Sequence, residues 1–325
     1  MSDFWHFFNE PVRLLAPMEG LTDPLMRRIL TKIAVELGRG YDWTVSEFIR
    51  VTHYPLPAHT FYKFVPELHQ GGKTSSGTPV HVQLLGNNPQ TMSESAVVAV
   101  NCGACAIDLN FGCPAKTVNN HKGGSVLLDE PETMFAIIHA TRQAVPKHIP
   151  VSAKIRLGYT DTSLMQEIGC AIKEANTSWL TVHARTKTDG YKPPAYWDKI
   201  VHFTGLGMPV IANGEIWTGD DARRCVSEAD TPHLMLGRGA VTYPDLIANI
   251  DNPKACLTWQ ELISYQIEFL NDNTDNQNGL IGRYKQWLGM LTGGYDEAKL
   301  LWDIIKREKS KESIAHHLRE SAKLL

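Results

Sequence analysis

The sequence lacks the marks of several protein classes. No run of about 18 apolar residues occurs in its 325 residues, so we expect no membrane-spanning helix. The first residues include Asp3 and no long apolar stretch, which is unlike a secretory signal. Only 6 residues are cysteine, too few for a disulfide scaffold, and a reducing cytoplasm is the expected compartment.

Metal-binding patterns and a strong net charge are also missing. The 13 histidines show no H-E-x-x-H or similar spacing. Cys102 and Cys105 form a C-x-x-C pair, but no second pair completes a four-ligand zinc site. We therefore predict no metal and a structural role for both cysteines. The net charge of −3 gives the chain as a whole no general attraction for a polyanion such as RNA.

The sequence does contain a regular alternation of two patterns before residue 253. Eight short apolar runs bounded by Gly, Pro or Asn are typical of buried strands, at 12–16, 43–47, 80–85, 106–110, 151–155, 179–183, 209–213 and 233–237. Helix-like stretches lie between them, at 23–37, 89–100, 131–144, 163–175, 218–228 and 242–249. This order predicts an α/β fold, a (β/α)8 barrel, over residues 1–252. A doubly wound open sheet is the alternative, disfavoured because no G-x-G-x-x-G follows the first run.

After residue 252 the strand-like runs stop. Amphipathic stretches predict helices at 258–270, 282–291, 295–306 and 312–324, and a polar stretch predicts a loop at 271–279. We therefore expect a small all-helical domain at 253–325. Nothing in the sequence indicates an oligomer, so we expect a monomer.

Polar residues stand where the predicted strands end, and in a barrel those ends form the rim of the active site. After the last two runs, Asn213-Gly214 and Gly237-Arg238-Gly239 combine glycine N–H groups with one guanidinium. That combination is typical of a phosphate site. Two ordinary glycine turns are the alternative.

Lys154 and Gln83 lie inside strand ends and are expected to face an apolar barrel mouth. A buried lysine is costly unless it pairs with an electron-rich group. A flavin ring is such a group, because a cation near its N1 and O2 edge stabilises the reduced form and an amide matches its pyrimidine edge. For Lys154, an ion pair with a neighbouring strand is the alternative.

Cys113 lies between Gly112 and Pro114, just after the fourth run. A cysteine in such a loop is unlike a core cysteine. A thiol with an ordinary pKa near ~8.5 is mostly protonated at neutral pH. Cys113 can therefore serve as a proton donor or as a nucleophile, and the residues around it leave both roles open.

These motifs resemble, in this order, those of the bacterial tRNA-dihydrouridine synthases over essentially the full chain. The segments that carry the resemblance are 15–20, 82–86, 108–114, 154–158, 182–186, 211–216 and 237–240. Within that family, segments 17–20, 46–51, 213–217 and 285–288 resemble the C subfamily, which reduces uridine 16 of the D-loop.

The resemblance implies an FMN-binding barrel followed by a helical tRNA-binding domain. The residues it assigns to the flavin are Pro17, Met18, Glu19, Gln83, Lys154, His183, Asn213, Gly214, Glu215, Gly237 and Arg238. It makes Cys113 the proton donor. The residues it assigns to the RNA are Arg50, Asn110, Tyr191, Arg283, Lys285, Met290 and Lys306. Met290 and Lys306 depart from the Tyr and Arg usual there, and Lys306 keeps the charge without the bidentate fork.

The implied reaction reduces the C5=C6 bond of a D-loop uridine to 5,6-dihydrouridine. NADPH reduces the FMN, a hydride passes to C6, and Cys113 protonates C5 from the opposite face. The uridine must leave the folded D-loop, because a stacked base cannot reach the flavin. A flavin barrel acting on a small pyrimidine and a non-catalytic tRNA-binding protein are the alternatives.

Charge is unevenly distributed along the chain. Residues 1–252 hold 22 Lys and Arg against 25 Asp and Glu, whereas residues 281–325 hold 9 against 6. A protein that binds a folded tRNA by its shape needs a local basic strip rather than a basic whole. We therefore expect binding that weakens with salt, with contributions from Arg283 and Lys285.

Overall fold

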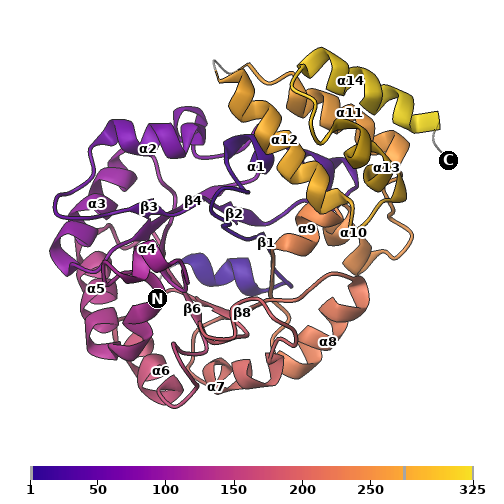
Figure 1. Cartoon of the computed structure of the whole chain (residues 1–325). Coiled ribbons are helices and arrows are strands. Elements are labelled where there is room, and N and C mark those ends of the chain that lie inside the picture. Colours follow the sequence, from indigo (N-terminus) through magenta and orange to yellow (C-terminus); the bar gives the residue numbers. More distant parts are fainter. Residues whose placement is uncertain (1–2, 274–275, 324–325) are drawn as a thin grey trace.

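The computed structural model describes residues 3–273 and 276–323, and a closed sheet of parallel strands lies at its centre (Figure 1). The strands are β1 (Arg13–Leu15), β2 (Trp43–Val45), β3 (Ile49–Arg50), β4 (Val80–Leu85), β5 (Ile107–Phe111), β6 (Val151–Arg156), β7 (Leu180–His183), β8 (Val210–Asn213) and β9 (Leu234–Leu236). Their order is β2-β1-β9-β8-β7-β6-β5-β4-β3, and a β2–β4 pairing closes the barrel.

β2 and β3 share one position in the barrel. Both pair with β4, Thr44 opposite Val80 and Ile49 opposite Leu84. The predicted strand 43–47 therefore ends two residues early, at Val45. With β2 and β3 counted as one position, the sheet has the eight positions of the predicted (β/α)8 barrel, which is confirmed.

Helices surround the sheet in Figure 1. They are α1 (Pro24–Glu36), α2 (Ala58–Phe64), α3 (Pro89–Asn101), α4 (Lys116–Asn119), α5 (Pro131–Ala144), α6 (Met165–Glu174), α7 (Val201–Thr204), α8 (Gly219–Ala229), α9 (Arg238–Thr242) and α10 (Leu246–Asp251). Local chemistry fixes their starts: the Asp23 side chain accepts from the Met26 N–H ahead of α1, and Thr218 and Asp221 form a capping box at α8. The prediction of one helix at 242–249 is wrong, because Pro244 keeps Tyr243 out of helical geometry and separates α9 from α10.

The C-terminal region contains only helices among its described residues: α11 (Trp259–Leu270), α12 (Gln277–Leu291), α13 (Asp296–Ile305), α14 (Lys311–Glu320) and a short 3-10 helix, Ser321–Lys323. The predicted loop 271–279 is too long, because the Asn276 side chain accepts from the Gly279 N–H and starts α12 at Gln277. The predicted helix 312–324 is shorter, and position 324 lies outside the described residues. α11 packs on α1 and α12 packs on α9, and their apolar side chains continue the barrel core.

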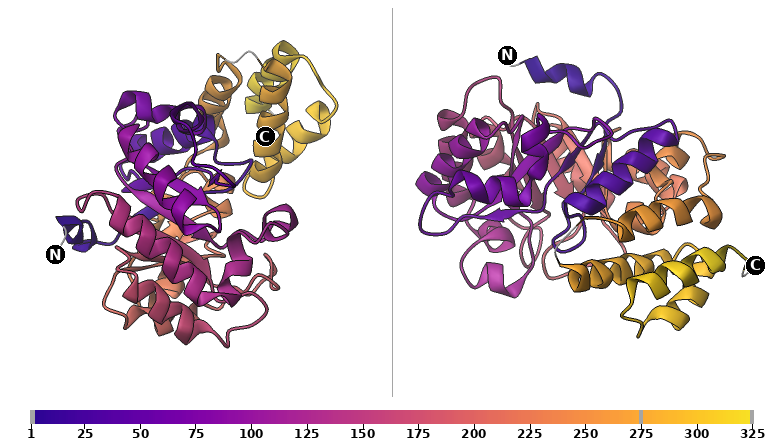
Figure 2. Two further views of the ribbon diagram at one scale, coloured as in Figure 1. Left: turned by 90° about the vertical axis from the view of Figure 1, so that its left-hand side faces the viewer. Right: turned by 90° about the horizontal axis from the view of Figure 1, so that it is seen from above.

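The two ends of the barrel differ. A 3-10 helix, Asp3–Phe8, covers the end where the strands begin, on the side opposite α12–α14 (Figure 2). The Phe8 ring lies 5.9 Å from the Trp43 ring, 5.7 Å from Trp179 and 5.0 Å from His233, centre to centre. This aromatic plug seals the amino ends of the strands and leaves the carboxyl ends for a site. None of the helices in the described part of the chain is long and apolar enough to cross a membrane.

A buried ion pair joins α1 to the segment that follows α2. The fully buried Arg27 donates from Nε and Nη2 to the two carboxylate oxygens of Glu67, both at 2.9 Å. We predict that Glu67→Ala lowers the free energy of unfolding by about 3–5 kcal/mol, because it leaves a buried guanidinium unpaired. Chemical denaturation measures this, with the exposed Glu10→Ala as control; a loss under about 1 kcal/mol would contradict it.

Candidate active site

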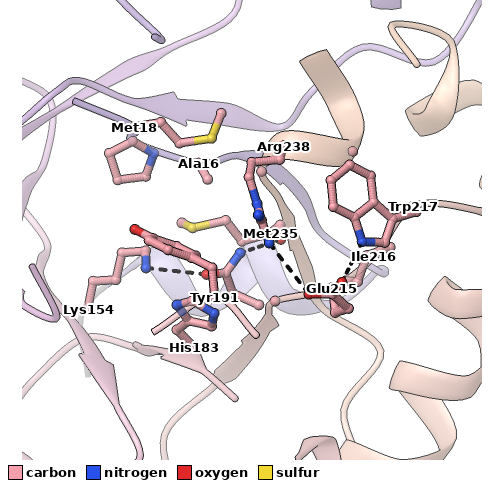
Figure 3. Close-up of a pocket in the computed structure, with 15 residues that line it drawn as sticks. Ala16, Met18, Lys154, His183, Tyr191, Glu215, Ile216, Trp217, Met235 and Arg238 are labelled. Atoms are coloured by element: carbon pink, nitrogen blue, oxygen red, sulfur yellow. Dashed lines mark hydrogen bonds and ion pairs between the residues drawn. The ribbon is translucent and has the colours of Figure 1, made fainter. Parts of the chain in front are cut away.

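A cavity opens at the carboxyl ends of the strands (Figure 3). Its lining residues are Ala16, Pro17, Met18, Lys154, His183, Tyr191, Asn213, Gly214, Glu215, Ile216, Trp217, Met235, Gly237, Arg238 and Gly239. Nine of the eleven residues expected around a flavin are among them. The other two are Glu19, which is exposed, and Gln83, which is fully buried.

Lys154 projects from β6 into this cavity. Its side chain is buried, and within the described residues its ammonium has one hydrogen-bond acceptor, Asn213 Oδ1 at 3.3 Å. The Asn213 amide donates from Nδ2 to Met235 O at 2.8 Å, which fixes its oxygen toward Lys154. Burial, aided by Arg156, lowers the pKa of Lys154 to about 8. The site thus presents a poorly compensated cation.

On the opposite wall, hydrogen-bond donors and two guanidinium groups surround the carboxylate of Glu215. Glu215 accepts hydrogen bonds from the buried Arg185, from Trp217 Nε1 at 2.9 Å and from Arg238 Nη2 at 3.5 Å (Figure 3). Arg185 and Trp217 lower the pKa of Glu215 against the effect of its partial burial. Arg238 is half-buried and close to the cavity, where an incoming phosphate can reach it.

Two glycines of this wall leave no room for a side chain. A Cβ at Gly214, where φ is +115°, would lie 2.7 Å from His183 Cδ2, and a Cβ at Gly239 would lie 2.1 Å from Ile216 O. Both positions therefore need glycine, because a side chain would collide with a neighbouring part of the wall.

Tyr191 covers the cavity from the loop after β7. Its exposed ring lies between two guanidinium groups, 5.2 Å from Arg156 and 5.0 Å from Arg238. The ring centre of His183 lies 5.9 Å away. Burial and the cationic neighbours, Arg156 first among them, lower the pKa of His183 well below its ordinary value, so its imidazole is neutral.

Arg156 connects this loop to the cysteine loop. Its Nε donates to Gly112 O at 2.9 Å, and its Nη1 donates to Thr186 O at 3.0 Å and to Gly190 O at 2.9 Å. The guanidinium is buried at the carboxyl end of β6. One side chain therefore positions both the Cys113 loop and the Tyr191 loop.

Cys113 lies beside the cavity rather than in its lining, and it is 9% exposed. Its N–H donates to Asn110 Oδ1 at 2.9 Å, and its carbonyl accepts from Asn119 Nδ2 at 3.0 Å and from the Ser125 N–H at 3.0 Å. Burial raises the pKa of the thiol. A protonated thiol on a fixed loop suits a proton donor better than a nucleophile.

The residues expected to contact RNA fall into two groups. Arg50 is half-buried beside a second hollow, which His53, Asn87 and His121 also line, and none of the described residues pairs with it. Tyr191 is exposed above the cavity at the strand ends, and Asn110 is buried next to Cys113.

The C-terminal members of that set are engaged within the protein. Arg283 donates to Asp23 Oδ2 at 2.9 Å, to Leu21 O at 2.8 Å and to Gly20 O. Lys285 donates to Lys306 O at 3.1 Å and to Glu308 O. The Lys306 ammonium pairs with Asp303 at 2.8 Å, and Met290 packs half-buried against the core. Arg283 therefore ties α12 to the loop that carries Pro17 and Met18.

Sequence reasoning missed several lining and bracing residues. Trp217, Met235 and Ile216 line the cavity, and Arg156 and Arg185 hold its loops. Trp217 stacks within 5.2 Å of the Arg238 guanidinium. Arg156 and Arg185 were visible as charged residues at strand ends, but a sequence does not say which carbonyls a buried guanidinium will bind.

Comparison with known proteins identifies the family. A family model described as "Dihydrouridine synthase" matches residues 14–320. The chain belongs to the dihydrouridine synthase family. A tRNA-dihydrouridine(16) synthase of Pseudomonas syringae pathovar tomato is 45% identical over 302 residues, covering 90% of this chain and 94% of that protein. A protein of the same name from Shewanella oneidensis is 44% identical over 95% of this chain and 97% of that protein.

Solved structures share the fold of this dihydrouridine synthase at low identity. TcOYE with pHBA superposes with a TM-score of 0.51 at 10% identity, over 76% of this chain and 90% of that one. A 2-naphthoyl-CoA reductase complex gives a TM-score of 0.56 at 10% identity, over 76% of this chain and 51% of that one. These likenesses support the barrel alone.

Family membership makes the chain an oxidoreductase that converts tRNA uridine to dihydrouridine, and it implies a flavin cofactor. The cavity fits that cofactor: it combines a buried ammonium whose one hydrogen-bond acceptor among the described residues is an amide, a guanidinium beside glycine-containing loops, and an apolar wall of Ala16, Met18 and Met235. Among the described residues, no cluster of His, Cys, Asp and Glu is suited to hold a metal ion.

The lowered pKa of Lys154 makes a prediction for the flavin-free protein. Between about 8 and the ordinary 10.5 the unfolded chain binds more protons at this lysine than the folded one, so stability rises with pH across that window. We predict that Lys154→Met removes a gain of roughly 3 kcal/mol over this range. Denaturant unfolding of both proteins at pH 7.5 and pH 10.5 measures the difference, and parallel pH profiles would contradict it.

Proposed function

We propose that this enzyme reduces uridine 16 of the tRNA D-loop, the target of the C subfamily, with FMN as cofactor and NADPH as reductant. The observation that carries the proposal is the extent of the match: two relatives named for position 16 align with 90% and 95% of the chain, helical region included. Because an RNA-orienting region decides which uridine reaches the flavin, likeness in that region supports the same position. Met290 and Lys306 are the positions where this chain departs from the expected RNA contacts.

The proposed residue roles follow the geometry. Lys154 would stabilise negative charge on the reduced flavin ring, and Arg238 with the backbone at Gly214 and Gly237 would hold the phosphate. The other residues proposed to contact FMN are Pro17, Met18, Glu19, Gln83, His183, Asn213 and Glu215. Exposure of Glu19 and complete burial of Gln83 make these two the least direct contacts.

The bound flavin supplies the hydride for uracil C6. Cys113 gives its thiol proton to C5, which its raised pKa favours because the thiol stays protonated at neutral pH. Asn110, buried beside Cys113, hydrogen-bonds the extruded uracil. Tyr191 contacts the RNA from the outer side of the cavity.

We further propose a cytoplasmic monomer with a catalytic barrel at 1–252 and a tRNA-binding region at 253–325, to which Arg50 and the C-terminal cations add contacts. Arg283 and Lys285 would then bind RNA only in part, since each already has partners within the protein. Other exposed cations of this region, Arg307 and Lys309, remain available to phosphates.

Replacement of the proton donor tests the reaction. We predict that Cys113→Ala keeps its flavin and its reduction by NADPH but loses 10²–10⁴-fold in dihydrouridine formation, the usual contribution of a general acid. Mapping dihydrouridine along the D-loop of purified tRNA measures the product and its position. Cys256→Ala, at an exposed cysteine, is the control. Normal turnover by Cys113→Ala would remove this residue from the mechanism, and activity on free uracil would favour a small-pyrimidine reductase.

Replacing Arg50 and replacing Arg283 are expected to differ in their effect on the melting temperature. We predict that Arg50→Ala weakens tRNA binding and reduces the salt slope by about 1 while leaving the melting temperature unchanged, because its side chain pairs with none of the described residues. Arg283→Ala is expected to lower the melting temperature as well, because it removes three bonds between α12 and the barrel. Lys147→Ala, an exposed change at the amino end of β6, is the control for both. Identical melting behaviour of the two arginine variants would contradict the distinction.

A further inference from the structure

A continuous line of hydrogen bonds runs from the middle of the barrel to the loop that carries Cys113. Ser152 Oγ donates to Asp108 Oδ1 at 2.6 Å, and Gln83 Nε2 donates to Asp108 Oδ2 at 2.6 Å. Asn110 Nδ2 then donates to Gln83 Oε1 at 2.8 Å. Asn110 Oδ1 finally accepts from the Cys113 N–H at 2.9 Å and from the Gly112 N–H at 3.0 Å.

The sheet register accounts for this line. Gln83 on β4 pairs with Asp108 on β5, which pairs with Ser152 on β6. Asp108 and Asn110 are two residues apart on β5, so both face the barrel interior. All four side chains are buried, Gln83 and Ser152 completely, and each polar group must therefore find its partner within the protein.

Both ends of the line have a fixed polarity. The N–H groups of Gly112 and Cys113 can only donate, so they require the oxygen of Asn110. An ionised carboxylate at Asp108 can only accept, so it requires the nitrogen of Gln83. Between the two, the amides of Gln83 and Asn110 have a single orientation that satisfies every bond.

Asp108 is the acidic member of the line. Burial raises the pKa of Asp108, while the hydrogen bonds from Ser152 and Gln83 and the charge of Lys154 favour its ionised form. An amide at this position keeps the native order of bonds only if it turns its nitrogen to Ser152 Oγ; in the opposite rotamer it donates to Gln83. That reversal would present the Gln83 nitrogen to the Asn110 nitrogen, and the Asn110 oxygen would have to turn away from the cysteine loop.

We propose that Asp108 is a positioning residue: its acceptor-only side chain sets the orientation of Gln83 and Asn110, and through them the position of the Cys113 loop. The correct orientation also leaves Asn110 with one free N–H beside Cys113, suited to a carbonyl oxygen of the uracil. This last step rests on the proposed function, whereas the control of the loop does not.

The first test replaces the carboxylate with its isosteric amide, Asp108→Asn. We expect the flavin-loaded protein to keep its visible flavin spectrum but to lose the two bonds that hold the Cys113 loop to Asn110. The rate at which iodoacetamide alkylates Cys113, followed by peptide mass spectrometry, should then rise about tenfold or more. Dihydrouridine formation should fall by a similar factor.

A second variant restores the polarity from another position. In Asp108→Asn combined with Gln83→Glu, the new amide can donate to the new carboxylate, and that carboxylate can again accept from Asn110 Nδ2. The alkylation rate of Cys113 should return to within about threefold of the wild type, although flavin binding changes. If the two native side chains are needed only for packing, the double variant should instead show a higher alkylation rate of Cys113 than Asp108→Asn alone.

Ser152→Ala is the matched control, because it removes one bond to Asp108 and leaves the acceptor for Gln83 in place. Its alkylation rate should stay within about threefold of the wild type. The proposal is overturned if Asp108→Asn leaves that rate unchanged, or if Ser152→Ala raises it equally. If Asp108→Asn does not fold, the double variant alone tests the proposal. It must then fold, and its Cys113 must be alkylated at close to the wild-type rate. Alkylation needs no RNA, so a wrong tRNA position would leave this test unaffected.

Discussion

The molecule depends on the closure of a parallel sheet on itself. The β2–β4 pairing joins the ends of the strand order, and because every strand runs the same way, all carboxyl ends meet at one rim. Register then decides which side chains become neighbours there: Asn110 is opposite Lys154, and His183 is opposite Asn213. Residues more than a hundred positions apart thereby share one cavity.

A polar barrel interior requires internal partners, and this chain supplies them with buried arginines and amides. Arg156 and Arg185 bind backbone carbonyls of the loops that follow β5 and β7, so these loops are anchored to the barrel by hydrogen bonds. The carboxylate of Glu215 forms ion pairs with Arg185 and Arg238. Charge-assisted hydrogen bonds to the main chain thus help to fix the loops around the cavity, together with the apolar core.

Much of this arrangement was predictable from sequence. Apolar runs bounded by glycine and proline gave the barrel, and polar residues at the run ends gave most of the cavity lining. Side-chain partners were not predictable in the same way. Arg283 and Lys285 look like free cations in a basic stretch, yet both bind carbonyl oxygens far along the chain. Long flexible side chains reach several acceptors, and only the packed fold selects one. Whether the boundary at 253 separates two folding units stays a prediction, because one apolar core spans it.

The clamp made by Arg283 has a consequence for how relatives can be recombined. It joins α12 to the β1–α1 loop through two main-chain carbonyls and one carboxylate, and that loop also carries Met18 into the cavity. The position of the β1–α1 loop therefore depends on direct hydrogen bonds from the helical region. A chimaera that joins this barrel to the helical region of another relative keeps the β1–α1 loop in place only if that region has a guanidinium group at the position of Arg283.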